Sequence, residues 1–508
     1  MVATSQSLAA QVGLQTLLSG GNAVDAAVAT AAALTVVEPT MNGLGSDAFA
    51  IVSAENKLYG LNASGKSPAA WSPSRFADLS EMPSLGWDSV TVPGAVSGWV
   101  ELSNKFGKLP FAQLLAPAIQ FAREGFHVSP IVAQQWNAQA PRLSNQPGFK
   151  STFLINGEAP STGDLFKNPQ QSETLEQIAI TNGKSFYSGE IAKKIVTDCK
   201  SHGGAMDFTD FNQHKAEWVN PIKIGYKGYQ LHELPPNGQG IAALIALGIL
   251  SHFDLIAMGE NSADALHVQF EAMKLAFADT YSFISDLNTM TFDHNLLLDT
   301  NYLKKKSQLI DMKRALPFKA GNPIASDTVY LSAADKDGMM VSFIQSNYKG
   351  FGSGVVAKNT GVSLQNRAAG FNLQPGHPNQ VDGGKRPFHT IIPGFLTKKN
   401  KPVMSFGVMG ADMQPQGHVQ MIIKTIDFNH NVQDTIDSPR WKVTKDNEVN
   451  IEEGIPTTTM EKLVHRGHKI NLCAYGELEF GAAQLIRQID HGYIGGSESR
   501  RDGLVAGL

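Results

Sequence analysis

The chain has 508 residues, with 42 Lys and Arg against 46 Asp and Glu, which gives a net charge of −4. Hydrophobic residues make up 42% and charged residues 17%, enough apolar material for a large packed core, so the composition excludes a disordered protein. The near-neutral charge predicts neither a nucleic-acid nor a membrane partner. Two cysteines, Cys199 and Cys473, are too few for a disulfide framework. Length alone would suggest about three domains.

An Ala- and Val-rich stretch, residues 8–37, lies near the start of the chain. No Lys or Arg precedes it, and polar residues and a glycine pair interrupt it, whereas a signal peptide has a basic start and a continuous apolar core. The same interruptions disfavour a membrane span. The pattern predicts two helices joined by a turn at residues 19–22, the second over about residues 23–36 and packed closely against a sheet. A cytoplasmic location is expected.

Helical patterns dominate the first 280 residues, and strand patterns dominate after about residue 320. Helices are expected at residues 114–124, 239–249 and 263–278. A hairpin is expected from strands at 329–334 and 339–346, joined by the turn at 335–338. Further strands are expected at residues 391–396, 403–407 and 419–426. A helix-rich part followed by a strand-rich part favours sheets sandwiched by helices.

A candidate nucleophile, Thr328, opens the first strand of the second part. An internal Thr is a weak nucleophile unless a base lies beside it. If the Asp327–Thr328 peptide bond breaks, Thr328 gains an α-amine, and such amines have a pKa of about 7.7–8.0 and can deprotonate the neighbouring hydroxyl. The same hydroxyl could perform the cleavage by attacking the preceding carbonyl. Taken alone, a Thr at the start of a strand is most often structural.

A series of motifs in a fixed order resembles the gamma-glutamyltransferase family. These motifs lie at residues 20–27, 37–39, 43–45, 92–98, 114–126, 235–240, 327–338, 384–387 and 495–503. Each string is weak evidence by itself, but the whole set, in family order over nearly the full chain, is strong.

The resemblance implies an α+β fold of the N-terminal-nucleophile hydrolase type, a four-layer αββα sandwich that matures by cutting its own chain. Residues 1–327 would form the large-subunit segment and residues 328–508 the small-subunit segment, both within one co-folded unit. The implied activity is that of a threonine amidohydrolase or acyltransferase acting through an acyl-enzyme. The expected partner is a small acyl amide or γ-glutamyl-like substrate, without metal or organic cofactor. The oligomeric state stays open, an assembly of processed heterodimers being one option.

The resemblance also assigns catalytic residues. Thr328 would be the nucleophile, and Ser346 would supply the partner hydroxyl, in place of the family's Thr. Gly410 and Ala411 would offer the backbone N–H groups of the oxyanion hole. Because Ala411 stands where the family has a second glycine, this expectation requires that the backbone need no positive φ there.

Substrate-binding positions depart from the family pattern. Gly370 stands where an acidic residue should hold the donor's α-amine. Tyr348 and Arg367 replace the family's Asn and Gln. The paired serines that follow Lys-Arg become His389 and Thr390.

These departures predict poor recognition of γ-glutamyl compounds. An α-ammonium site without a carboxylate loses its charge-assisted hydrogen bonds, and Arg367 would favour a carboxylate instead. The Arg that clamps the donor's α-carboxylate should fall near Pro73, and Arg75 is the nearest candidate. The pattern is closer to the acylase-like branch, which cleaves amides such as glutaryl-type acyl groups.

Several alternatives remain open at this point. The chain could be a true gamma-glutamyltransferase or glutathione hydrolase, or a catalytically silent, unprocessed binding protein. His389 is equally well explained as a substrate-pocket donor or as a structural histidine. For Asp47, capping of a turn is favoured over a role in the site. His214, His232 and His267 show no metal-ligand spacing, so no metal site is expected.

Overall fold

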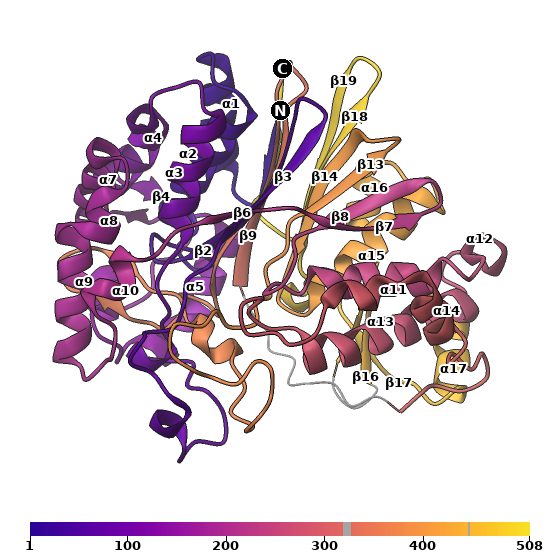
Figure 1. The fold of residues 1–508 in the computed structure, drawn as a ribbon. Helices are drawn as coiled ribbons and strands as arrows, with labels where there is room; N and C mark the ends of the chain where they lie inside the picture. Colours follow the sequence, from indigo (N-terminus) through magenta and orange to yellow (C-terminus); the bar gives the residue numbers. More distant parts are fainter. Residues whose placement is uncertain (318–326, 445–447) are drawn as a thin grey trace.

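The protein is described by a computed structural model that covers residues 1–317, 327–444 and 448–508, with only the backbone of Asp327. The predicted change of character near residue 320 lies outside the described residues. Figure 1 shows two facing sheets with helices on both outer faces. The predicted αββα sandwich is therefore confirmed.

The first sheet is antiparallel, in the order β20-β1-β9-β10-β2-β3-β6. Its strands are β20 (Leu504–Ala506), β1 (Val2–Thr4), β9 (Asp327–Ala334), β10 (Met340–Tyr348), β2 (Asp47–Ala54), β3 (Lys57–Ala63) and β6 (Glu217–Val219). In this sheet β1 lies between strands of the second part of the chain, and β10 is paired with β2 of the first part. The two parts of the chain therefore share one hydrogen-bonded framework.

The second sheet has the order β19-β18-β14-β13-β8-β7, and the two parts of the chain meet in it where β13 pairs with β8. Its strands are β19 (Gly492–Ser497), β18 (Ala482–Ile489), β14 (Lys401–Met409), β13 (Gly394–Lys398), β8 (Tyr229–Glu233) and β7 (Ile222–Tyr226). Small sheets are formed by β15 (Trp441–Val443), β16 (Glu448–Glu452) and β17 (Lys469–Cys473), by β11 (Val356–Ala357) and β12 (Val362–Ser363), and by β4 (Phe126–His127) and β5 (Leu165–Phe166).

Two groups of helices complete the sandwich (Figure 1). Beside the first sheet lie α1 (Ser7–Leu18), α2 (Ala23–Val37), α3 (Ala95–Phe106), α4 (Phe111–Glu124), α5 (Pro130–Leu143), α6 (Phe149–Phe153), α7 (Pro169–Thr181), α8 (Lys184–Ser188), α9 (Glu190–Ser201) and α10 (Phe208–Asn212). Beside the second lie α11 (Gly240–Leu250), α12 (Leu255–Met258), α13 (Ala263–Phe283), α14 (Thr300–Ser307), α15 (Met413–Ile426), α16 (Val432–Asp437) and α17 (Thr457–His465). No helix in the described ranges is long and apolar enough to cross a membrane.

The predicted helix pair at the start of the chain is confirmed by α1 and α2. Asn22 and Asp25 form a reciprocal capping box that starts α2. Every residue of α2 is buried, and it packs against β9 and β10. Its alanines let the helix approach the sheet closely, as the composition predicted.

The predicted hairpin is formed by β9 and β10. Asp335 organises its turn, because its carboxylate accepts the N–H groups of Asp337 and Met339 and, from α2, that of Ala23. The positive φ of 89° at Gly338 completes the turn. This hairpin carries the candidate nucleophile at its open end.

The strand expected at residues 419–426 is wrong, because this segment is the second half of α15. Nearly all of α15 is buried, so its sequence lacks the alternation of apolar and polar faces that marks a surface helix. A short apolar run of this kind cannot be distinguished from a buried strand by its period. The helix expected at 263–278 is real but extends to Phe283.

The two sheets meet through a column of small and polar side chains. Ser332 on β9 donates to Ser405 Oγ on β14 at 3.0 Å. Gly407 lies flat on the ring of Tyr330, where a Cβ would come within 2.4 Å of ring carbons. Moving two residues forward on β14, from Ser405 to Gly407, thus corresponds to moving two residues back on β9, from Ser332 to Tyr330. The same move taken once more brings Met409, the last residue of β14, over Thr328.

Candidate active site

The predicted nucleophile and its partner lie together between the sheets. Thr328 Oγ1 donates a hydrogen bond to Ser346 Oγ at 3.1 Å, and both side chains are buried. The N–H of Tyr348 also donates to Ser346 Oγ, at 2.8 Å. A bulge in the β9–β10 pairing between Gln345 and Tyr348 allows this approach. The pair has the geometry in which one hydroxyl can polarise another.

A third polar side chain, that of Asp47, continues the row across the sheet. Asp47 on β2 is paired directly with Ser346 on β10, and paired residues present their side chains on the same face. Its carboxylate accepts the N–H groups of Gly94 at 3.0 Å and Gly65 at 3.3 Å. Asp47 therefore caps backbone N–H groups, as favoured from the sequence, and its side chain also lies beside Ser346 in the candidate site.

His389 and Asp47 form a buried pair, with His389 Nε2 3.2 Å from Asp47 Oδ2. The N–H of Ile391 points to His389 Nδ1 at 3.4 Å, which leaves the ring proton on Nε2. Burial, followed by the nearby cation of Arg367, holds the pKa of His389 well below its usual range. Burial raises the pKa of Asp47 to about 7, against the opposing attraction of Arg367. His389 is therefore a neutral donor to an acid that titrates near neutrality.

Arg367 is buried beside the same pair. Its Nη1 donates to Thr390 Oγ1 at 2.8 Å, and its guanidinium carbon lies 4.5 Å from the centre of the Tyr348 ring. Its Nε and Nη2 have no hydrogen-bond partner, and no carboxylate of the described residues lies within ion-pair distance of it. Burial lowers the pKa of Arg367 to about 10, so it remains a cation. The four predicted substrate-binding residues thus share one neighbourhood.

The predicted oxyanion loop follows the end of β14. The backbone of Gly410 has a φ of 123° and that of Ala411 a φ of 51°. The condition that Ala411 need no positive φ is therefore not met, and Ala411 adopts the left-handed conformation at a cost of about 1 kcal/mol. Within the described part of the chain, neither residue's N–H donates a hydrogen bond. Gln239 holds the loop by donating to the carbonyls of Ala411 at 2.8 Å and Thr390 at 2.6 Å.

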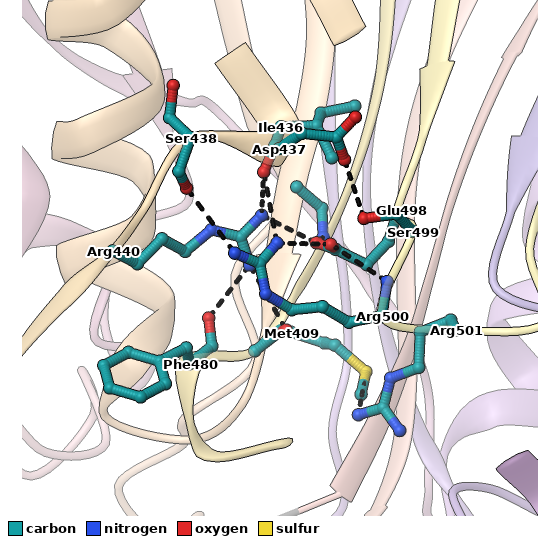
Figure 2. A network of polar contacts seen from close by, with 12 residues as sticks. Met409, Ile436, Asp437, Ser438, Arg440, Phe480, Glu498, Ser499, Arg500 and Arg501 are labelled. Carbon is teal, nitrogen blue, oxygen red and sulfur yellow. Dashed lines mark hydrogen bonds and ion pairs between the residues drawn. The ribbon is translucent and has the colours of Figure 1, made fainter. Parts of the chain in front are cut away.

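A buried network of polar contacts around Arg440 and Arg500 lies near the end of β14, and Figure 2 shows it together with Met409. Arg440 donates to the carbonyls of Phe480 and Gly481. Gly481 in turn packs on Gly410, where a Cβ would lie 3.0 Å from Gly481 Cα. Arg501 reaches Met409 Sδ at 3.8 Å. Arg440 and Arg501 therefore hold the residues that flank the predicted oxyanion loop.

A cavity of about 830 Å³ opens next to these residues. Tyr348, Thr390, Gly370, Lys349 and Asp412 contribute to its wall. Gly370 has no room for a side chain, because a Cβ there would lie 2.5 Å from the carbonyl oxygen of Phe388. The position that carries an acid in the family pattern is therefore closed here by the backbone.

Arg75 does not take part in this cavity. It donates to Asp88 at 2.8 Å and to the carbonyl of Gly203 at 3.1 Å. Both ionic partners are partly exposed. Arg75 therefore does not bind the donor's α-carboxylate in this cavity, although its position near Pro73 had suggested so.

The sequence profile of the gamma-glutamyltranspeptidase family matches residues 9–508. The chain belongs to this family. The glutathione hydrolase-like YwrD proenzyme of Bacillus subtilis is 34% identical over 519 residues, covering 100% of this chain and 98% of the relative. The oxamate amidohydrolase proenzyme of Klebsiella pneumoniae is 34% identical over 524 residues, with the same coverage.

A solved structure agrees with this assignment. Cephalosporin acylase from Bacillus halodurans matches with a TM-score of 0.95 at 46% identity, covering 99% of this chain and 95% of that one. The protein is therefore an enzyme of the hydrolase and acylase type found among gamma-glutamyltranspeptidase relatives.

Three side chains of the site were not found from the sequence: Asp412, Gln239 and Arg440. Asp412 stands just after the oxyanion loop and accepts a hydrogen bond from the phenol of Tyr281. Its place after the glycine loop was an available signal. Gln239 and Arg440 act through backbone carbonyls, which no sequence pattern reveals.

Two clusters of possible metal ligands lie outside the site in the described residues: the partly exposed Cys473, Glu477 and Glu479, and a buried cluster. The buried cluster is formed by His267, Glu271 and His468. His267 Nε2 donates to the carbonyl of Asp311, which makes its Nδ1 the acceptor from His468 Nε2 at 2.8 Å. Lys274 already supplies a cation to Glu271 at 2.8 Å. The buried cluster is thus a closed hydrogen-bond chain that joins helix α13 to the loop before β17.

Proposed function

We propose that this protein is a self-processing amidohydrolase with Thr328 as its N-terminal nucleophile. The hydrogen bond between Thr328 and Ser346 carries the proposal, because it lies at the expected cleavage point. The N–H groups of Gly410 and Ala411, which donate no hydrogen bond within the described residues, follow the strand end that the register brings over Thr328. Hydrolysis is favoured over transfer, since two similar proteins are named as a hydrolase-like proenzyme and an amidohydrolase.

Maturation uses the same hydroxyl as catalysis. Thr328 Oγ1 attacks the carbonyl carbon of Asp327, and the C–N bond breaks to give an ester and a free α-amine on Thr328. Water then hydrolyses the ester, leaving a new carboxylate on Asp327. The cut leaves segments of 327 and 508 − 327 = 181 residues.

In turnover, the new α-amine takes the proton as Thr328 Oγ1 attacks the substrate's amide carbon. The backbone N–H groups of Gly410 and Ala411 stabilise the oxyanion. The leaving amine departs with the proton, and an acyl ester remains on Thr328. Water attacks this ester, the acid is released, and the hydroxyl is restored.

The preferred acyl group carries a carboxylate. Arg367 lies directly behind the wall that Tyr348 and Thr390 form, with two N–H donors unused. A guanidinium with free donors fits a carboxylate in a bidentate manner. Oxamate, named for one relative, is itself an amide with a carboxylate. Gly370 leaves no place for the family's ammonium-binding acid.

A true γ-glutamyl hydrolase is the second candidate, and Asp412 favours it. This carboxylate lines the cavity, and an acid there would attract an α-ammonium group. The two candidates are separated by comparing the turnover of a glutaryl donor with that of a γ-glutamyl donor.

The test begins with a denaturing gel and intact-mass measurement of purified protein. We expect two segments of 327 and 181 residues, and a single uncut band from Thr328→Ala. A single band from the wild type would instead favour the silent binding protein. Release of p-nitroaniline from glutaryl and γ-glutamyl donors is then compared. Preference for the glutaryl donor supports the proposal, and preference for the γ-glutamyl donor supports the second candidate.

A further inference from the structure

We propose that Asp47, held by His389, is a positioning residue that serves as the built-in counter-charge of Arg367 and weakens its hold on the substrate's carboxylate when Asp47 is ionised. This inference rests on the proposed function and adds a residue that controls its substrate preference. It makes recognition of the acyl carboxylate dependent on a second, internal carboxylate.

The first observation is the isolation of Arg367. The guanidinium is buried with one side-chain hydrogen bond, to Thr390, and two unused donors. A buried cation without a compensating charge is costly. No described carboxylate pairs with it directly, so compensation by Asp47 acts through space. The contacts place the two groups in one neighbourhood, because Thr390, which accepts from Arg367, follows His389, which donates to Asp47.

The second observation is the way Asp47 is held. His389 Nε2–H and the N–H groups of Gly65 and Gly94 all point at its carboxylate. Its pairing with Ser346 fixes its position on the strand. Asp47 therefore cannot turn toward Arg367 to form an ion pair without giving up these donors, and its influence is electrostatic rather than direct.

The third observation is the balance of charge around Asp47. Among the described residues, the ionisable groups that act on it are His389, Arg367, Arg386 and Tyr187. The proposed cut adds the α-amine of Thr328, whose side chain is joined to Ser346, the strand partner of Asp47. Burial raises the pKa of Asp47 to about 7, while both arginines oppose that shift. Below this pH, Asp47 is neutral and Arg367 is an uncompensated cation. Above it, Asp47 is an anion that offsets Arg367 and repels an incoming carboxylate.

The experiment compares two donors that differ only in charge: glutaryl-p-nitroanilide and its neutral terminal amide. The ratio of their kcat/KM values cancels the pH dependence of the chemistry, because both use the same nucleophile and leaving group. For the wild type, we expect the ratio to fall about tenfold as the pH rises through neutrality, the equivalent of one pKa unit of interaction. The change should appear in KM more than in kcat.

Three variants sharpen the result. Asp47→Asn should hold the ratio at its high, low-pH value across the range. His389→Leu should move the midpoint to higher pH, because the ionised carboxylate loses a hydrogen bond. Asp337→Asn, at an exposed carboxylate of the hairpin turn, is the matched control and should behave as the wild type.

A flat ratio in the wild type overturns the inference, as does a ratio that still falls in Asp47→Asn. The wild-type profile decides the matter even if Asp47→Asn does not mature. Turnover of both donors with a flat ratio removes the role of Asp47 alone. Processed protein that turns over neither donor would overturn the proposed substrate class, and this inference with it.

Discussion

Arg440 and Arg500 are buried among carboxylates, whereas Arg367 is buried without one in direct contact. Arg500 makes ion pairs of 2.6 Å with both Glu452 and Glu498, and Arg440 makes one of 2.6 Å with Glu498. The charges of the Arg440–Arg500 cluster are therefore compensated, and Figure 2 shows its polar contacts. Arg367 keeps free donors beside the cavity. Arg440 and Arg500, whose charges are compensated, fit a structural role, whereas Arg367, whose charge has no direct partner, fits the proposed role in substrate recognition. Substitutions can test this difference.

The largest effect is expected at the reaction centre. Thr328→Ala removes the hydroxyl on which the proposed maturation and turnover both depend, so activity should fall by more than about 10⁴-fold, to background. The thermal unfolding temperature should change little, because Thr328 lies at the open end of a hairpin. Thr328→Ser, which keeps a hydroxyl, is the control and should still be cut.

The next largest effect is a loss of folding stability in the cluster of Arg440, Arg500, Glu452 and Glu498. Glu498→Gln leaves Arg440 and Arg500 short of a counter-charge, and breaking such a buried pair costs about 3–5 kcal/mol. Denaturant unfolding measures it, with the exposed Glu190→Gln as control, which should leave the midpoint unchanged. A loss no larger than that of the control would show that the cluster does not stabilise the fold.

Acidification should give a related signature. Although burial opposes it, Arg440 and Arg500 lower the pKa of Glu498. The folded-state pKa lies below the unfolded one, so this stabilisation is complete above the unfolded value and is lost as the pH falls through the folded one. Unfolding measured below about pH 4 should therefore narrow the difference between the wild type and Glu498→Gln.

A loss of catalytic rate is expected at Gly410, which packs against Gly481 at the edge of the Arg440–Arg500 cluster. Gly410→Ala places a Cβ 3.0 Å from Gly481 Cα, at a residue whose backbone φ is 123°. The loop must therefore shift, and its N–H groups no longer point at the proposed oxyanion position. Loss of one oxyanion donor lowers kcat by about 10²–10³-fold. Single-turnover rates measure it. Unchanged kcat would show that the hole lies elsewhere.

A smaller change is expected in specificity. Arg367→Gln should reduce kcat/KM for the glutaryl donor by about 10–100-fold, as expected for the loss of a hydrogen bond to a charged group of about 1.5–3 kcal/mol. The neutral donor should be nearly unaffected. An equal loss for both donors would place Arg367 with the structural arginines and remove the contrast drawn above.

The smallest effect is at Ala411. Ala411→Gly relieves the left-handed strain but adds flexibility to the unfolded chain, so stability should change by less than about 1 kcal/mol. Maturation and kcat should be retained. A large loss of kcat would mean that the Ala methyl group itself contributes to the site.

Local turn chemistry and a clear alternation were sufficient to predict the hairpin that carries Thr328 and Ser346. The αββα sandwich and the partnership of the two hydroxyls were expected only from the family resemblance. Local pattern failed at α15, whose complete burial removes the helical period. Charges that meet across the sandwich, such as Asp47 with His389, come from segments more than 340 residues apart. Their meeting depends on strand register, which local pattern does not determine.

Strand β1 lies between β9 and β20, with Val2 paired to Ala333 on one side and Ala506 on the other. The two ends of the chain are therefore neighbours (Figure 1), while the proposed cut opens the molecule far from them. A short linker from Leu508 to Met1 would turn the processed pair into one chain that begins at Thr328. Once its initiator methionine is removed, such a circular permutant would have Thr328 as its N-terminus without self-cleavage. It would separate the enzyme's need for a free amine from its need for self-cleavage.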